Sequence, residues 1–184
     1  LSNQITDISP LASLTNLRRL TLTGDQIADI TPLASLTKLE ILYLWRTQIT
    51  DISPLASLTK LRRFTLSGNQ ITDISPLTSL TNLETLYLGK NQVTDISPLA
   101  SLTNLRRLTL RSNQKITDIS PLASLTNLRR LTLTGNQIAD ISPLTSLTNL
   151  GSLNFLVNPL SDDAINRQIP KLKAKGINVR YRTT

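Results

Sequence analysis

Leucines recur along the chain in a fixed pattern. The motif Leu-x-x-Leu-x-Leu begins at Leu17, Leu39, Leu61, Leu83, Leu105, Leu128 and Leu150. Successive units are 22 residues apart, except for one spacing of 23 residues that contains the extra residue Lys115. Repeats of this length are typical of a solenoid, in which every repeat forms one coil and neighbouring coils stack.

The first part of each unit predicts a short strand. In the fourth full unit, Leu86 and Leu88 alternate with Thr85, Tyr87 and Gly89. Because successive strand residues point to opposite faces, the leucines face the core and the residues between them face the other side. Stacked coils therefore place their strands side by side in a parallel sheet.

The second part of each unit predicts a turn or a 3₁₀ helix. Its apolar positions in the same repeat are Val93, Ile96, Leu99 and Leu102. This spacing of three is too dense for a strand, and Pro98 is incompatible with an ordinary helix interior. One coil cannot bury its own leucines, so the coils are stable only as a stack.

The repeat resembles the leucine-rich repeats of bacterial proteins, specifically the internalin-like class with 22 residues. The resemblance rests on Leu-x-x-Leu-x-Leu and on Ile-x-Asp-Ile-Ser-Pro-Leu, which occurs at residues 49–55, and it covers essentially the whole chain. It implies an α/β fold: a right-handed solenoid or horseshoe, with a concave parallel sheet and a convex side of 3₁₀ helices or turns. A single domain, 1–184, is expected, made of a partial N-terminal coil (1–16), six full repeats (17–149) and a last coil with a C-terminal cap (150–184).

The C-terminal segment predicts a helix followed by a strand. Ser161 is a typical N-cap and precedes two aspartates, while Ile165, Ile169 and Leu172 recur at helical spacing. Pro170 is expected to kink or split this helix, which ends at Gly176. Residues 177–181 alternate as a final strand. The segment is similar to the Asn-Pro-Leu-Ser ending common in bacterial leucine-rich repeat domains.

Two polar columns repeat with the leucines and are interpreted as structural. Asn69, Asn91, Asn113, Asn136 and Asn158 follow the strands, where an amide can pair with free backbone groups of adjacent coils. Asp25 and Thr47 interrupt this column, so the ladder should be weaker there. The aspartates Asp7, Asp29, Asp51, Asp73, Asp95, Asp118 and Asp140 are expected to accept local backbone and hydroxyl hydrogen bonds. A ladder of calcium sites is the alternative, but the glycine-shaped loops typical of such sites are missing from the sequence.

Composition excludes most catalytic chemistry. The chain has no histidine and no cysteine, which removes the commonest general base, the commonest metal ligand and any disulfide. Its hydrophobic residues are spread too evenly for a membrane span. We therefore expect no enzyme, no metal and no cofactor. A net charge of +8 favours an anionic partner, but the sequence does not predict a cellular location.

The residues that differ between repeats lie at the exposed strand positions. Two of these positions carry eight arginines, and Arg18, Glu40, Arg62, Glu84 and Arg106 alternate in sign, so some of them should form ion pairs across strands. Exposed aromatic residues beside arginines are typical of binding hot spots. The predicted partner-binding residues are Tyr43, Trp45, Arg46, Arg63, Tyr87, Lys90, Arg107, Arg111 and Arg130.

These residues favour a scaffold that binds an acidic or amphipathic protein or peptide, within a larger protein. The alternative is binding of a polyanion, either nucleic acid or an acidic glycan, by the basic concave face. Glu40 and Glu84 would interrupt an anion track, and no nucleic-acid-binding motif is present. Near-identical coils are typical of recent duplication or of a designed consensus array. The inserted Lys115 and the departures at Asp25, Thr47 and Phe64 favour a natural array.

Overall fold

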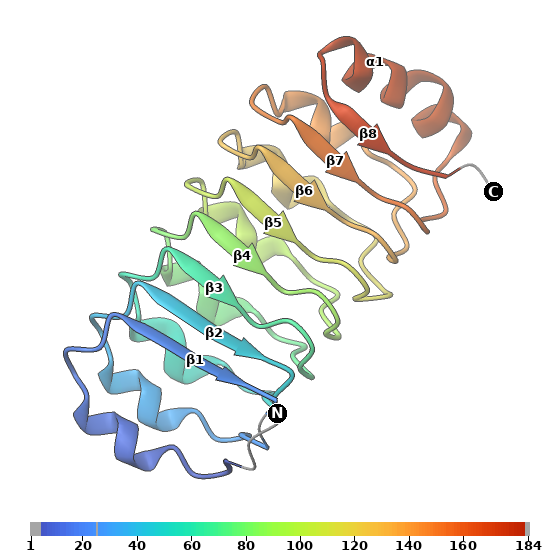
Figure 1. The fold of residues 1–184 in the computed structure, drawn as a ribbon. Coiled ribbons are helices and arrows are strands. Elements are labelled where there is room, and N and C mark those ends of the chain that lie inside the picture. Colours follow the sequence, from blue (N-terminus) through green and yellow to red (C-terminus); the bar gives the residue numbers. More distant parts are fainter. Residues whose placement is uncertain (1–4, 25, 183–184) are drawn as a thin grey trace.

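The structure is a computed structural model that describes residues 5–24 and 26–182. In this part of the chain eight strands form one parallel sheet in sequential order (Figure 1). They are β1 (Arg19–Thr23), β2 (Ile41–Trp45), β3 (Arg63–Thr65), β4 (Thr85–Tyr87), β5 (Arg107–Thr109), β6 (Arg130–Thr132), β7 (Ser152–Asn154) and β8 (Asn178–Arg180). Equivalent positions of neighbouring coils pair, as Leu20 does with Leu42 and Leu108 with Leu131.

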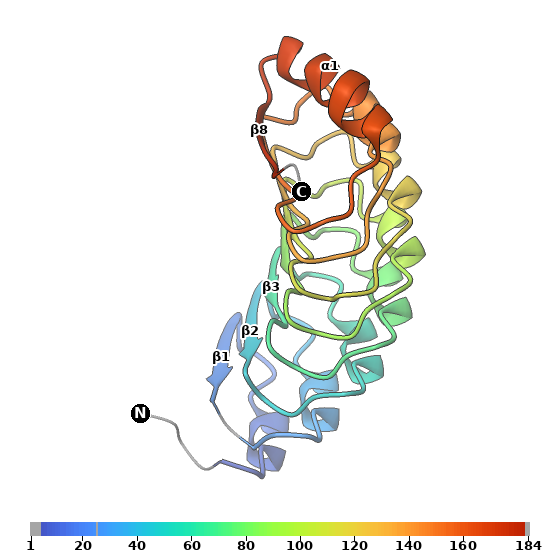
Figure 2. The same ribbon diagram turned by 90° about the vertical axis from the view of Figure 1, so that its right-hand side faces the viewer.

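Each coil returns through a five-residue 3₁₀ helix. These helices are η1 (Ser9–Ser13), η2 (Thr31–Ser35), η3 (Ser53–Ser57), η4 (Ser75–Ser79), η5 (Ser97–Ser101), η6 (Ser120–Ser124) and η7 (Ser142–Ser146). The second residue of each is proline, whose fixed φ suits a first helical turn. Figure 2 shows the sheet on the inner side of a gentle arc and the 3₁₀ helices on the outer side. The predicted solenoid, with its concave sheet, is confirmed.

The core is a continuous column of aliphatic side chains between sheet and 3₁₀ helices. Leu86 and Leu88 on the strand side and Leu99 on the helix side are all fully buried. Burying such a side chain contributes about 1.5–3 kcal/mol, and the neighbouring coils provide the burial. In the described part of the chain, none of the helices has the length and apolar character needed to cross a bilayer.

The C-terminal cap contains the predicted helix and strand. The Oγ of Ser161 accepts a hydrogen bond from the backbone N–H of Ala164 at 3.1 Å, as expected of an N-cap. A π-helical stretch, η8 (Ala164–Gln168), precedes α1 (Ile169–Ala174), so the winding changes at the residue before Pro170. Gly176 ends the helix with φ of 81°.

The asparagine column forms the predicted ladder of backbone hydrogen bonds. The Nδ2 of Asn91 donates to the carbonyls of Leu88 and Leu66, both at 3.0 Å, and its Oδ1 accepts from the N–H of Ile71 at 3.2 Å. One amide therefore satisfies its own coil and the preceding one. The asparagines of the column are all buried.

The ladder is weaker at two places in the described residues. Thr47 is buried in an asparagine position, and its only side-chain hydrogen bond there is donated to Asn69 Oδ1 at 2.5 Å. In the coil that follows the inserted Lys115, the buried Oδ1 of Asn136 has no hydrogen-bond partner within the described residues. Gln114, next to the insertion, has φ of 68°, which marks a local bulge. Asp25, the other predicted weak point, lies outside the described residues.

We predict that Asn91→Ala lowers the free energy of unfolding by about 2–4 kcal/mol, because two carbonyls and one N–H lose their buried partner. Chemical denaturation followed by circular dichroism measures the change. Asn104→Ala is the matched control. This exposed asparagine donates a single bond to the Thr81 carbonyl, so its loss should cost less than about 1 kcal/mol. Equal losses at the two positions would contradict a buried ladder.

Candidate functional site

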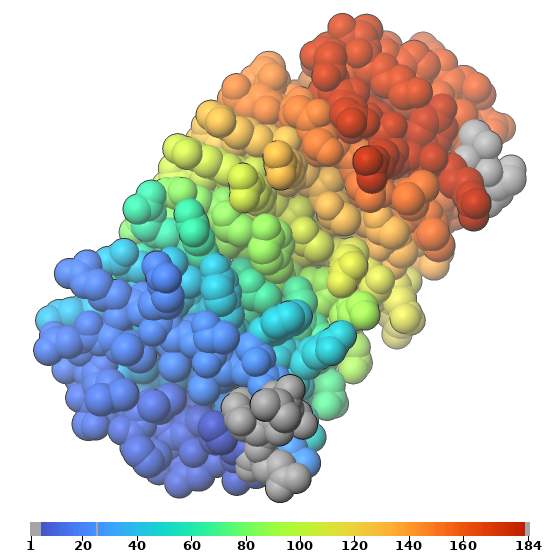
Figure 3. Space-filling view, viewed as in Figure 1, coloured from blue at the N-terminus to red at the C-terminus, as the bar shows by residue number. Residues whose placement is uncertain are grey.

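A shallow trough on the concave face brings the three predicted aromatic anchors together. Tyr43 and Trp45 extend from β2, and Tyr87 extends from β4. The trough has a volume of about 610 Å³ and is lined by Thr21, Tyr43, Trp45, Thr65, Ser67, Tyr87, Thr109, Arg111 and Thr132. The sheet face that carries it is turned toward the viewer in Figure 3.

The strand register explains the shape of the trough. Tyr43 pairs with Thr65, and Thr65 pairs with Tyr87, so a short side chain separates two rings. Parallel strands lie about 4.8 Å apart, which places the two tyrosine backbones about 10 Å from each other. The threonines and Ser67 were not among the predicted binding residues, because threonine is an ordinary strand residue and gives no functional signal by its type.

Trp45 is the most exposed aromatic side chain of the trough. It is 47% exposed, and the guanidinium carbon of Arg46 lies 6.0 Å from its ring centroid. This distance is at the outer limit of a cation–π contact. The pair therefore presents an apolar surface with a positive charge beside it.

Arg111 covers the position of a missing side chain. A methyl group placed on Gly89 would lie 2.7 Å from Arg111 Cγ and 3.1 Å from the Arg111 carbonyl oxygen. Only glycine leaves room for this arrangement. Because Gly89, two residues after β4, has no side chain, Arg111 has room to line the trough.

Arg46 and Lys90 lie at a strained turn that follows the strands. The residue at this position has positive φ in each of seven coils: Gly24, Arg46, Gly68, Lys90, Ser112, Gly135 and Val157. Glycine adopts this left-handed conformation without penalty, whereas other residues are disfavoured there by about 1–2 kcal/mol. Arg46 and Lys90, each with φ of 56°, therefore carry a conformational cost that glycine would avoid.

The remaining predicted arginines occupy one column outside the trough. Arg63 pairs with Ile41 and Thr85 on its two neighbouring strands. Arg107 pairs with Arg130, and both line a smaller cavity that they share with Tyr87. The nine predicted residues thus divide into the trough, its strained margin and this arginine column.

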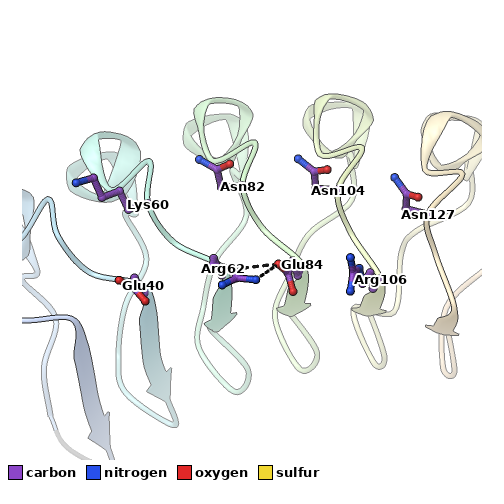
Figure 4. Close-up of a pocket in the computed structure, with 8 residues that line it drawn as sticks. All are labelled: Glu40, Lys60, Arg62, Asn82, Glu84, Asn104, Arg106 and Asn127. Atoms are coloured by element: carbon purple, nitrogen blue, oxygen red, sulfur yellow. Dashed lines mark hydrogen bonds and ion pairs between the residues drawn. The ribbon is translucent and has the colours of Figure 1, made fainter.

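A second, more polar groove follows the edge where the 3₁₀ helices lead into the strands (Figure 4). Its volume is about 550 Å³, and it is lined by Glu40, Lys60, Arg62, Asn82, Glu84, Asn104, Arg106 and Asn127. Asn82 and Asn104 donate to the carbonyls of Thr59 and Thr81 at 2.9 and 3.0 Å. These amide groups tie adjacent coils together, so we interpret this groove as structural.

Two of the predicted ion pairs form along this edge. Arg18 contacts Glu40 at 2.5 Å, and both the Nε and an Nη of Arg62 donate to Glu84. The Arg62 hydrogen bond, and then the nearby positive charges of Arg106 and Arg63, lower the pKa of Glu84 below its ordinary value. The acidic residues of the edge are therefore already engaged by arginine.

The aspartate row accepts local hydrogen bonds as predicted. In one coil, the Oδ1 of Asp95 accepts from the backbone N–H of Ser97 at 2.8 Å, and its Oδ2 accepts from the Ser97 hydroxyl at 2.9 Å. The same pair of bonds recurs at Asp51 and Asp118. Each carboxylate therefore holds the start of a 3₁₀ helix. No cluster of three metal-ligating side chains occurs among residues 5–24 and 26–182.

Comparison with known proteins identifies the repeats. A profile of two leucine-rich repeats matches residues 1–35, 37–79 and 81–124, and a profile of a single leucine-rich repeat matches residues 124–141. No protein with a curated description matches the chain.

Solved structures of bacterial repeat proteins share the fold. The internalin InlF of Listeria monocytogenes is 39% identical, with a TM-score of 0.90, over 98% of this chain and 54% of its own. Internalin C2 of the same organism is 38% identical, with a TM-score of 0.91, over 99% of this chain and 78% of its own. A leucine-rich repeat protein of Leptospira interrogans is 25% identical, with a TM-score of 0.72, over 97% of this chain and 52% of its own. The chain thus spans about half the length of the first and third of these proteins.

We predict that Lys90→Gly raises the free energy of unfolding by roughly 0.5–1 kcal/mol, because glycine relieves the positive φ. The same substitution should weaken binding of a partner on the concave face. Ser112→Gly is the matched control: it relieves a φ of 55° at the equivalent turn but removes no predicted binding residue. Denaturation and binding measured on both variants test the idea, which fails if Lys90→Gly is destabilising or if both variants bind the partner equally well.

Stability should depend on the charge of the aspartate row. Hydrogen bonds from the backbone N–H and then the hydroxyl of the following serine lower the pKa of Asp51 and Asp95 below 3.8. A lowered folded-state pKa stabilises the protein above pH 3.8, and this contribution disappears as the pH falls through the folded-state pKa. The melting temperature should therefore be nearly constant from pH 7 to 5 and fall below pH 4. In Asp51→Asn/Asp95→Asn that fall should be smaller, and an unchanged fall would exclude these carboxylates as its cause.

Proposed function

The chain belongs to the leucine-rich repeat proteins of the internalin-like 22-residue class, and from this premise we propose that it binds a protein or peptide in its concave aromatic trough. The family consists of interaction scaffolds that generally have no catalytic activity, and we infer no enzymatic activity for this chain. Tyr43, Trp45 and Tyr87 serve as apolar anchors. Arg63, Arg107, Arg111 and Arg130 supply charged contacts at the sides. The partner surface is therefore amphipathic and acidic.

The observation that carries the proposal is the exposed aromatic trough itself. Trp45 is 47% exposed on the concave face, whereas the adjacent Leu44 of β2 points to the core and is fully buried. Clusters of aromatic residues next to arginine are enriched at the centres of protein interfaces, where they account for most of the binding energy. Aromatic residues also favour strands for their own sake, but their grouping around one trough supports a binding role.

The strained margin supports the same proposal. Arg46 and Lys90 occupy a conformation that glycine adopts in the equivalent turns at Gly24, Gly68 and Gly135. Residues in such conformations occur most often at functional sites. Both are basic, so a role in holding an acidic partner accounts for their presence.

Protein binding is favoured over a polyanion track by the arrangement of charge. At the edge of the sheet, Glu40 and Glu84 pair with Arg18 and Arg62, which removes two arginines from a continuous basic path. A stack of coils with few hinges also offers a preformed surface, so binding need not order a flexible site.

The test is affinity capture from a source lysate, with and without nuclease, followed by identification of the retained partner and titration calorimetry. Tyr43→Ala, Trp45→Ala and Tyr87→Ala should each weaken binding about tenfold or more, the range of interface hot spots. Lys60→Ala, on a coil turn at the edge, is the matched control and should change the affinity less than about twofold.

Two outcomes would contradict the proposal. Retention of nucleic acid or glycan alone, held equally by the triple aromatic variant, identifies a polyanion binder. Equal losses in the aromatic variants and in Lys60→Ala would mean that the trough is not the binding site.

A steep fall in affinity between 50 and 200 mM salt would assign the dominant contribution to the arginines.

A further inference from the structure

A small cavity adjoins the aromatic trough, over β4, β5 and β6. It has a volume of about 170 Å³ and is lined by Tyr87, Arg107, Leu108, Thr109, Arg130 and Thr132. Pockets that hold a whole small-molecule ligand usually have volumes of about 300–1,000 Å³. The size of this cavity therefore suits a single functional group.

Two like charges from neighbouring strands line this cavity. Arg107 on β5 pairs in register with Arg130 on β6, and neighbouring parallel strands are about 4.8 Å apart. Like charges directly opposite each other destabilise a sheet. No carboxylate forms an ion pair with either arginine among residues 5–24 and 26–182. The nearby acid, Glu84, is hydrogen-bonded to Arg62. An anion between the two guanidinium groups would remove this repulsion.

Arg63 shows that the arrangement is local to these two strands. It occupies the equivalent position on β3, where its neighbours in register are Ile41 and Thr85. Its positive charge also contributes to lowering the pKa of Glu84. Arg63 therefore has a partially compensating acid and no opposing arginine. Arg19 occupies the same position on β1, opposite Ile41, and is not one of the predicted binding residues, so it is the matched control.

The cavity also gathers hydroxyl groups. Thr109 pairs in register with Tyr87 on one side and with Thr132 on the other. All three residues carry a hydroxyl group and line the cavity. Hydroxyls and guanidinium groups can all donate to an oxyanion, and arginine forms paired bonds with phosphate-like groups. The arginines and the threonines therefore both supply hydrogen-bond donors to the cavity.

The cavity is continuous with the trough. Tyr87, Thr109 and Thr132 line both of them, so a group bound between the arginines can extend directly onto the aromatic surface. A ring attached to that group would lie against Tyr87, where aromatic pairs are favourable.

We propose that this cavity binds the oxyanion ester of an aromatic side chain, a phosphorylated or sulfated tyrosine of a partner protein. The oxyanion lies between Arg107 and Arg130, and the tyrosine ring lies against Tyr87 in the trough. The proposal rests on the proposed function, since it specifies the chemistry of the partner that the concave face holds. Phosphate and sulfate esters share the tetrahedral oxyanion, and the test separates these two sources.

The test uses small probes and needs no partner. The intact chain is titrated with phenyl phosphate, phenyl sulfate, inorganic phosphate and phenol while the Nε–H signals of the arginines are followed by NMR. Saturable shifts at Arg107 and Arg130, with a phenyl ester binding more tightly than inorganic phosphate or phenol, are the expected result. Arg107→Gln and Arg130→Gln should each weaken that binding about tenfold or more, and Arg19→Gln less than twofold. Thermal melts check that the variants remain folded.

The two sources of the ester differ in their response to pH. A phosphate monoester gains its second negative charge near pH 6, so raising the pH from 5.5 to 7.5 should tighten binding of phenyl phosphate. A sulfate ester keeps one charge over this range, and its affinity should not change. The tighter ester at pH 7.5 identifies the modification that the cavity accepts.

Three results would overturn the proposal: shifts that do not saturate, equal losses in Arg19→Gln and Arg107→Gln, or inorganic phosphate that binds as tightly as both phenyl esters. The test is also independent of the trough. If Trp45→Ala loses the partner protein but retains the probe, both proposals stand. If the probe fails while the aromatic variants still abolish partner binding, only the tyrosine-ester proposal is wrong.

Discussion

Burial of leucines between neighbouring coils is the interaction on which the rest of this structure depends. A single 22-residue coil exposes both of its flat sides, and its leucines leave water only when another coil lies above and below. Side chains such as Leu42, Leu86 and Leu131 are accordingly at most 1% exposed. The stacking also fixes the register of the sheet, because equivalent leucines must lie over one another.

Stacking the coils buries backbone polar groups, and the asparagine column supplies their hydrogen-bond partners. The chain turns inward after each strand, and the backbone groups there lie away from water and outside the sheet. The amide of Asn91, for example, pairs with carbonyls of two coils and accepts one N–H, so the turn can be buried with its hydrogen bonds retained. The aspartates perform the equivalent task on the exposed side by holding the start of each 3₁₀ helix. Because these structural hydrogen bonds come from other positions of the repeat, the exposed strand positions are free to vary.

The separation of structural positions from variable exposed positions explains why charged and aromatic residues concentrate on one face. On the sheet edge, glutamates neutralise arginines across neighbouring strands, as in the pair of Arg62 with Glu84. On the concave face, Arg107 and Arg130 oppose each other without such compensation in the described residues. Exposed ion pairs contribute little to stability, so the edge can be rearranged at little cost. These arginines and the exposed Trp45 are the side chains that the proposed partner would cover.

The sequence by itself determined the solenoid, the parallel sheet, the 3₁₀ returns, the asparagine ladder and the grouping of Tyr43, Trp45 and Tyr87 on one face. It could do so because a strict period converts each position of the repeat into a fixed place in the coil. Tertiary structure alone decided which of the predicted residues share a cavity. The trough is shaped by Thr65, which separates the two tyrosines, and by Gly89, whose missing side chain leaves room for Arg111. It also revealed the positive φ at Arg46 and Lys90, and the Oδ1 of Asn136 that finds no partner within residues 5–24 and 26–182. These features depend on backbone angles and on contacts between side chains of different coils, which a one-dimensional pattern of residue types does not specify.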